Sequence, residues 1–188
     1  MKTKSLLRPF LAACALALVS PGLRAQEMPE MPKPQSEHAW LAKFAGTWET
    51  EMECTMGPDK EPMKGKATET ARMLGGFWLI VENKAEMMGQ PFTGVLTLGY
   101  DPAKKSYIGT WTDSMTNYMW TYTGTVDASS DTLTLDTEGP CPMQGGKICK
   151  FKEVMKLTGK DEKTFTTSIQ GDDGKWTPMM NAKSKRVK

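Results

Sequence analysis

The feature that most constrains the fold of this 188-residue chain is a two-residue alternation of apolar and polar side chains that begins after Gly46. In the segment 47–56 (TWETEMECTM), three glutamates alternate with apolar or small residues, which is typical of a strand with one buried face. The same kind of pattern indicates nine further strands, at 66–74, 77–88, 92–100, 106–115, 118–127, 132–137, 147–158, 164–170 and 176–187. Turn residues such as 101–105 (DPAKK) and 171–174 (GDDG) separate them. Short strands with short connections predict an antiparallel meander.

A meander of this length has two exposed edge strands unless it closes on itself. Closure is the simplest way to remove these edges, so we predict an all-β fold, a β-barrel of about ten strands. One short helix precedes it at 37–45, because Ser36 can cap a helix and three apolar side chains then share one helical face. A barrel of this size encloses side chains or one small ligand.

The first 25 residues have the features of a secretory signal peptide. A basic start is followed by an apolar run at 10–19 (FLAACALALV), which is too short to cross a bilayer, and by the helix breaker Pro21-Gly22. We expect cleavage after Ala25 and export to the periplasm or out of the cell, with no transmembrane segment in the mature protein. Lipid attachment at Cys14 is a second alternative, which we rank lower because most of the apolar run follows that cysteine.

The remaining chain divides into two parts. Residues 26–35 (QEMPEMPKPQ) are rich in proline and polar groups, which predicts a flexible lead-in. Residues 36–188 contain the helix and all of the predicted strands, and form a single barrel domain.

Charge and composition exclude several classes of function. Lysine plus arginine total 24 and aspartate plus glutamate total 22, so no excess of basic residues marks a nucleic-acid partner. The chain has a single histidine, His38, which leaves almost no material for Ser–His, Cys–His or multi-histidine zinc sites. Haem is not expected either, since His38 precedes the strands. We therefore predict no metal and no cofactor.

Three cysteines follow the predicted signal peptide: Cys54, Cys141 and Cys149. Exported proteins reside in oxidising compartments, so one pair is expected to form a disulfide. Cys141 and Cys149 flank the turn-rich segment 142–146 (PMQGG) and are the candidate pair. Cys54 shares the apolar face of the first strand and is predicted to be free and buried.

Aromatic side chains gather by alternation on two consecutive strands. Tyr107, Trp111 and Asp113 share one face, and Tyr118 and Trp120 share a face of the next strand. An aromatic patch with one carboxylate is suited to bind a small, largely apolar molecule whose polar group the aspartate fixes. In the alternative, the aromatics fill the barrel and loop amides satisfy Asp113.

These five residues are our candidate ligand-binding set, and we predict a non-catalytic binding protein whose oligomeric state is open. An enzyme that uses Asp113 with Tyr107 or Tyr118 is an alternative, although no catalytic residue is assigned because the sequence shows no partner group for a lone aspartate.

Methionine is unusually frequent, with 15 residues. Clusters occur at Met28 and Met31, at Met87-Met88 and at Met179-Met180. Thioethers and thiolates select Cu(I), so a copper-handling or envelope interaction protein is a third hypothesis. The favoured interpretation is that methionine fills irregular gaps in the core.

A short helix followed by Gly46-Thr47-Trp48 resembles the opening of the calycin (lipocalin-like) barrels. The resemblance implies that Trp48 closes one end of the barrel and that Arg186, from the last strand, stacks over it. A longer resemblance rests on 38–41 (HAWL), 46–49 (GTWE), Gly94, 98–101 (LGYD) and 107–115 (YIGTWTDSM). Together these strings resemble the bacterial exported family DUF1579, a domain of unknown function. That family implies a calycin barrel over residues 36–187 and brings no established activity. His38 matches a family position on the short helix, where we expect it to cap the helix or to pack across the barrel mouth.

Overall fold

The computed structural model describes residues 30–55, 57, 60–127, 131–141 and 144–187. The predicted signal peptide and the start of the predicted lead-in lie outside the described residues. Residues 33–188 form the unit that contains the barrel.

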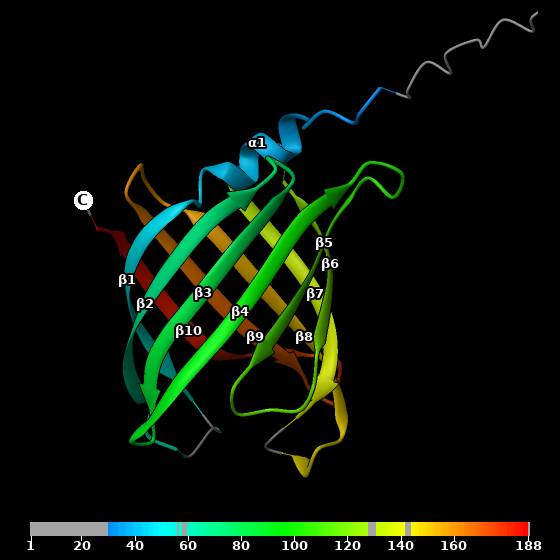
Figure 1. Ribbon diagram of the computed structural model, residues 1–188. Helices are drawn as coiled ribbons and strands as arrows, with labels where there is room; N and C mark the ends of the chain where they lie inside the picture. The colour runs from blue at the N-terminus through cyan, green and yellow to red at the C-terminus, as the bar shows by residue number, and fades with distance from the viewer. Residues whose placement is uncertain (1–29, 56, 58–59, 128–130, 142–143, 188) are drawn as a thin grey trace, which may run out of the picture. The chain divides into compact units, whose positions relative to one another are not determined.

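Ten antiparallel strands form a closed barrel in the described residues, and each strand pairs with the next along the chain (Figure 1). The last strand pairs with the first, so no edge remains. The elements are α1 (Ser36–Ala42), β1 (Gly46–Cys54), β2 (Met63–Leu74), β3 (Trp78–Met87), β4 (Gln90–Asp101), β5 (Ser106–Asp113), β6 (Trp120–Val126), β7 (Thr132–Pro140), β8 (Ile148–Leu157), β9 (Glu162–Gln170) and β10 (Trp176–Arg186). The predicted fold class is confirmed, including the single N-terminal helix.

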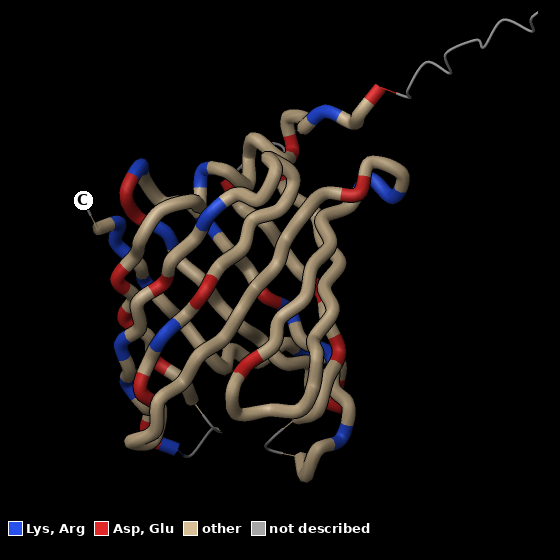
Figure 2. The backbone as a smooth tube through the Cα atoms, viewed as in Figure 1, with Lys and Arg blue, Asp and Glu red and all other residues tan. Residues whose placement is uncertain are grey.

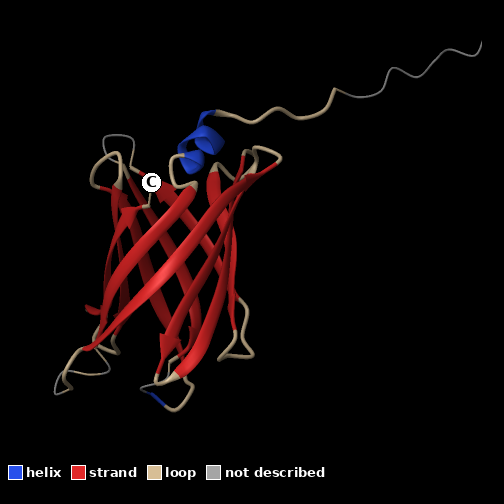
Figure 3. Ribbon diagram, turned by 60° about the vertical axis from the view of Figure 1, so that its left-hand side comes forward, coloured by secondary structure: helices blue, strands red, loops and turns tan. Residues whose placement is uncertain are grey.

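Helix α1 lies across one end of the barrel (Figure 3), and we call this the sealed end. Several side chains at this end are completely buried: Leu41 of α1 itself, and the inward-facing Leu79, Leu98, Leu133 and Leu135 of the strands. They form one cluster with Phe44 and Tyr107. The core of the protein is therefore concentrated at the sealed end.

The opposite end, where β1, β3 and β5 finish, is packed differently, and we call it the open end. On the side formed by β1–β5 its inward-facing side chains are half-buried: Met52, Cys54, Ala67, Asn83, Ala85, Phe92 and Trp111. On the side formed by β7–β9, by contrast, Cys149, Phe151 and Ile169 are buried and form a second cluster with Cys141. The side of the open end formed by β1–β5 is therefore less tightly filled than the sealed end.

Charged residues are interspersed along the strands (Figure 2). The register places lysines of β2 opposite glutamates of β1 on the outer face, as in Lys64–Glu53 at 3.3 Å and Lys66–Glu51 at 3.8 Å. Exposed pairs of this kind contribute about 0–1 kcal/mol each, so they fix register and solubility more than stability.

The predicted helix differs from α1 at both ends. Its N-cap is Gln35 rather than Ser36, because the Nδ1 atom of His38 accepts the Gln35 amide at 2.9 Å. The last residues of the predicted helix, 43–45, form tighter turns instead, since their amides bond to carbonyl groups three residues earlier.

The predicted disulfide between Cys141 and Cys149 is not shown. Both residues are free thiols in the structure and belong to one buried cluster with Phe151 and Ile169. Their pairing stays a prediction for the oxidised protein. Cys54 is half-buried rather than buried, because it is the last residue of β1 and lies at the open end.

Candidate ligand-binding site

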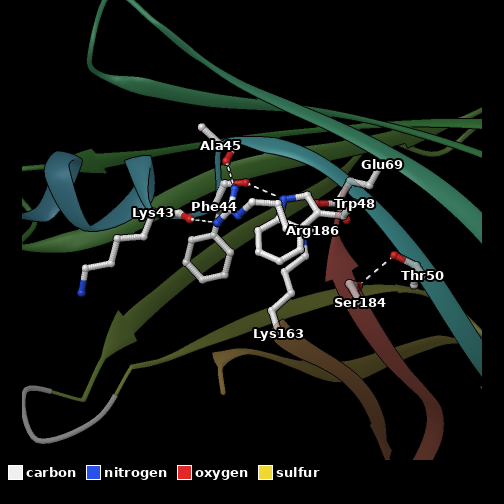
Figure 4. A network of polar contacts seen from close by, with 9 residues as sticks. All are labelled: Lys43, Phe44, Ala45, Trp48, Thr50, Glu69, Lys163, Ser184 and Arg186. Carbon is white, nitrogen blue, oxygen red and sulfur yellow. Dashed lines mark hydrogen bonds and ion pairs between the residues drawn. The ribbon is translucent and has the colours of Figure 1, made fainter. Parts of the chain in front are cut away.

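The sealed end is closed by a cluster around Trp48 (Figure 4). The indole is completely buried, and its Nε1 donates to the carbonyl oxygen of Phe44 at 2.9 Å. The Arg186 guanidinium lies 4.0 Å from the centroid of the indole ring and donates to main-chain oxygens in the segment 43–45. Gly46 has a φ of 130°, and a Cβ atom there would overlap with the guanidinium. These contacts tie the first and last strands to the segment that follows α1.

A buried ion pair lies beside this cluster. The Lys163 ammonium contacts the Glu69 carboxylate and lies 4.6 Å from the centroid of the Trp48 ring. Burial lowers the pKa of Lys163, and the Glu69 charge opposes this shift. The hydroxyl groups of Thr50 and Ser184 form a further hydrogen bond of 2.8 Å in the same region. The sealed end is thus filled by its own side chains.

Tyr107 lies at the sealed end, apart from the other candidate ligand-binding residues. Its ring packs against Tyr100 and Trp40, and its hydroxyl donates to the carbonyl oxygen of Glu37 at 3.3 Å. Burial, with a smaller contribution from the Glu37 charge, raises the pKa of Tyr107 to about 12. The structure therefore does not bring Tyr107 together with Trp111 and Asp113.

Asp113 ends β5 at the open end, and local donors occupy both of its oxygens. Oδ2 accepts from the Trp111 indole at 3.0 Å, and Oδ1 accepts from the amides of Met115 and Thr116 at 2.8 and 2.9 Å. The Thr116 hydroxyl adds a fourth contact at 3.2 Å. This is the arrangement that the loop-amide alternative describes.

We expect Asp113→Asn to lower the free energy of unfolding by about 1 kcal/mol, because an amide cannot accept all of these bonds. Urea unfolding measures this loss, with the exposed, outward-facing Asp136→Asn as the control. Unchanged stability together with weakened ligand binding would instead favour a ligand role for Asp113.

Trp120 and Tyr118 lie side by side at the open rim, with ring centroids 5.2 Å apart. Trp120 also meets Phe151 edge-on at 5.1 Å, and the Tyr118 hydroxyl donates to the carbonyl oxygen of Glu138 at 3.1 Å. A hollow of about 540 Å³ adjoins them. Its lining residues come from three segments: Ser114, Met115, Thr116, Asn117, Tyr118, Trp120, Pro140, Cys141 and Gly146. The structure thus groups Tyr118 and Trp120 beside this hollow at the open rim.

Glu153, about midway along β8, is a further candidate that the sequence analysis did not identify. It alternates with Cys149, Phe151 and Met155, so its side chain points into the barrel. Burial raises its pKa to about 7, and a hydrogen bond with the Tyr122 hydroxyl partly opposes this rise. A carboxyl group on an otherwise apolar inner face is costly unless it has a function or a partner.

Polar side chains of β6, β7 and β9 lie near Glu153, although its direct register partner on β7 is Leu135. Tyr122 of β6 has its pKa raised by burial and, to a smaller extent, by the charges of Glu153 and Asp113. On β7, Thr137 is buried and its Oγ1 has no hydrogen-bond partner among the described residues. Thr167 of β9 is the register partner of Glu153. The middle of the barrel interior is therefore polar on one side.

The profile of one protein family matches residues 33–186, which span the helix and all ten strands. The chain belongs to the DUF1579 family. This family is described as proteins of unknown function, so membership supplies no activity. No curated protein matches the DUF1579 chain significantly.

Solved structures show the same fold at low sequence identity. Rv2717c from M. tuberculosis is 12% identical, with a TM-score of 0.61 over 83% of this chain and all of the other. The S-type phycobiliprotein lyase CPES from Guillardia theta is 13% identical, with a TM-score of 0.51 over 82% of this chain and 99% of its own. These similarities support a calycin-like barrel and extend no further than the fold.

The metal hypotheses gain little from the arrangement of side chains. The described part of the chain contains no group of three or more histidine, cysteine, aspartate or glutamate side chains suited to a metal ion. Cys54 pairs with Met63 on one side and with Met180 on the other, which is one feature in favour of a soft-metal site, and the copper hypothesis stays untested. Met28 and Met143 lie outside the described residues. No helix among the described residues is long and apolar enough to span a membrane.

Proposed function

We propose that this DUF1579 protein is an exported, non-catalytic binding protein that takes a small, largely apolar molecule into its barrel through the open end. The contrast between the two ends carries this proposal. Large inward-facing side chains under α1, such as Leu79 and Leu98, are completely buried, whereas those of β1–β5 toward the open end are half-buried. The half-buried side chains of Phe92, Trp111 and Ala85 on this inner face suit an apolar ligand better than a charged one.

Catalysis by Asp113 has less support. The two tyrosines proposed as its partners, Tyr107 and Tyr118, donate to main-chain carbonyl groups instead. Both carboxylate oxygens of Asp113 already accept bonds from the loop that follows it and from Trp111. A general base needs an accessible lone pair next to the substrate, so a binding function fits this geometry better.

The test compares two tryptophan substitutions at adjacent positions of β2. Ala67 points inward and is half-buried, whereas Thr68 points outward and is exposed. The probe is the apolar dye N-phenyl-1-naphthylamine, whose fluorescence rises in apolar surroundings. We expect Ala67→Trp to fill the interior and weaken dye binding at least tenfold, equivalent to about 1.4 kcal/mol, and Thr68→Trp to leave binding unchanged.

Thermal unfolding checks that both variants are folded. If Ala67→Trp does not fold, Ala85→Leu on the neighbouring strand β3 is a smaller substitution that also fills the interior. If the dye does not bind the wild-type protein, or binds equally well when the interior is filled, the proposed function is wrong.

A further inference from the structure

The charges inside the barrel are divided between its two ends. Among the described strand residues that face inward, the positive side chains are Lys163 and Arg186, and both lie at the sealed end. Lys163 is paired with Glu69, while Arg186 contacts Asp161, the Trp48 ring and main-chain oxygens. Neither cation is available to a group nearer the open end.

Glu153 lies nearer the open end than these two cations. Its pKa is raised by burial and lowered only by the hydrogen bond with Tyr122, and no neighbouring cation contributes. The second inward-facing acid of this region is Asp113, whose charge also acts on Tyr122. The interior toward the open end thus contains two carboxyl groups and, among the described inward-facing strand residues, no base.

Thr137 adds an independent sign of an unfilled polar site. Its side chain is 6% exposed, and its Oγ1 has no partner among the described residues. Thr137 is the register partner of Phe151, and Glu153 lies two residues farther along the same strand, pointing to the same side. A buried hydroxyl without a partner costs about 1–3 kcal/mol, and a ligand that hydrogen-bonds to it would remove that cost.

We propose that Glu153, with Tyr122 and Thr137 beside it, recognises a protonated amine on an otherwise apolar ligand. This inference rests on the proposed binding function and specifies the chemical class of the ligand. An ammonium group supplies the positive charge that the interior lacks, and its three N–H donors match the carboxylate and the two hydroxyl groups. The apolar body of the ligand then extends past Trp111 and Phe92 toward the open end.

The test uses three probes of equal chain length that differ only in the head group: decylamine, decanol and decanoate. Displacement of the bound naphthylamine dye measures their affinities. We expect the wild-type protein to bind decylamine at least tenfold more tightly than either of the others. Glu153→Gln should abolish this preference and leave the affinity for decanol unchanged. The control is Glu138→Gln, an exposed acid on the outer face of β7, which should retain the preference.

A pH series gives a second readout. Amine binding requires an ionised Glu153, so the affinity for decylamine should rise between pH 5 and pH 8, through the pKa of about 7. The titratable groups that face Glu153 are Tyr122 of β6 and, beyond it, Asp113 of β5. In Glu153→Gln the pH dependence should disappear.

The melting temperature of Glu153→Gln at two pH values shows whether the variant is folded. The folded-state pKa of Glu153 is raised above its ordinary 4.5, so wild-type stability falls as the pH rises through about 7. Glu153→Gln is therefore expected to melt at a higher temperature than the wild type at pH 8 and at a similar temperature at pH 5.

Equal wild-type affinities for the three probes, or a preference for decylamine that survives in Glu153→Gln, would overturn the amine inference and leave the binding function intact. If neither the dye nor any of the three probes binds, the proposed binding function itself fails.

Discussion

Trp48→Ala is expected to lower the free energy of unfolding by about 3–5 kcal/mol, the usual range for a deleted core aromatic. The indole is completely buried, and three different groups depend on it. Its Nε1 bonds to the carbonyl group of Phe44, the Arg186 guanidinium stacks on one ring, and the Lys163 ammonium lies within 4.6 Å of the centroid. Deletion leaves a cavity and two cations without the aromatic surface that they contact.

Chemical denaturation of the wild type and the variant measures this loss. Trp176→Ala is the matched control, because Trp176 is 37% exposed on the outside of β10, where it contacts Lys152. It should cost much less than Trp48→Ala. Similar costs for the two substitutions would mean that the sealed end does not depend on its tryptophan.

The strands and their order could be predicted from the sequence because each strand of the closed barrel has one solvent-exposed face and one apolar face. Glu49, Glu51 and Glu53 are exposed between buried or half-buried neighbours, as the alternation predicts. Strand ends were harder to predict. β7 extends to Pro140, beyond the predicted 132–137, because Gly139 continues the inward face without an apolar side chain that would signal it.

The polar interior could be predicted only in part. The alternation of Cys149, Phe151, Glu153 and Met155 was sufficient to place the glutamate on the inner face. It could not show that Glu153 lacks a cation, because this depends on which end of the closed barrel holds Lys163. Pattern alone also could not decide between the two roles of Asp113, since the loop amides that bond to it belong to residues after the strand.

The second large effect concerns the ion pair of Lys163 and Glu69, whose side chains are 6% and 13% exposed. Removal of one partner of a buried pair leaves an uncompensated charge, which costs about 3–5 kcal/mol. We therefore expect Lys163→Met and Glu69→Leu each to destabilise the protein by this amount. The double variant should lose much less than the sum, since apolar residues of similar size replace both charges.

The sign of the pH dependence distinguishes this explanation from a simple packing defect. Burial already lowers the pKa of Lys163 below its ordinary 10.5, and Glu69 opposes that shift. In Glu69→Leu the carboxylate that opposes this shift is absent, so the folded-state pKa of Lys163 falls further. The pKa of Lys163 in the unfolded state is unchanged. Between these two values the unfolded state binds more protons than the folded state, and stability must rise with pH. Glu69→Leu should accordingly recover part of its lost stability as the pH is raised toward 10, whereas Lys163→Met should not. If the stability loss of Glu69→Leu is instead constant as the pH rises toward 10, lost packing causes it rather than the unpaired ammonium group of Lys163.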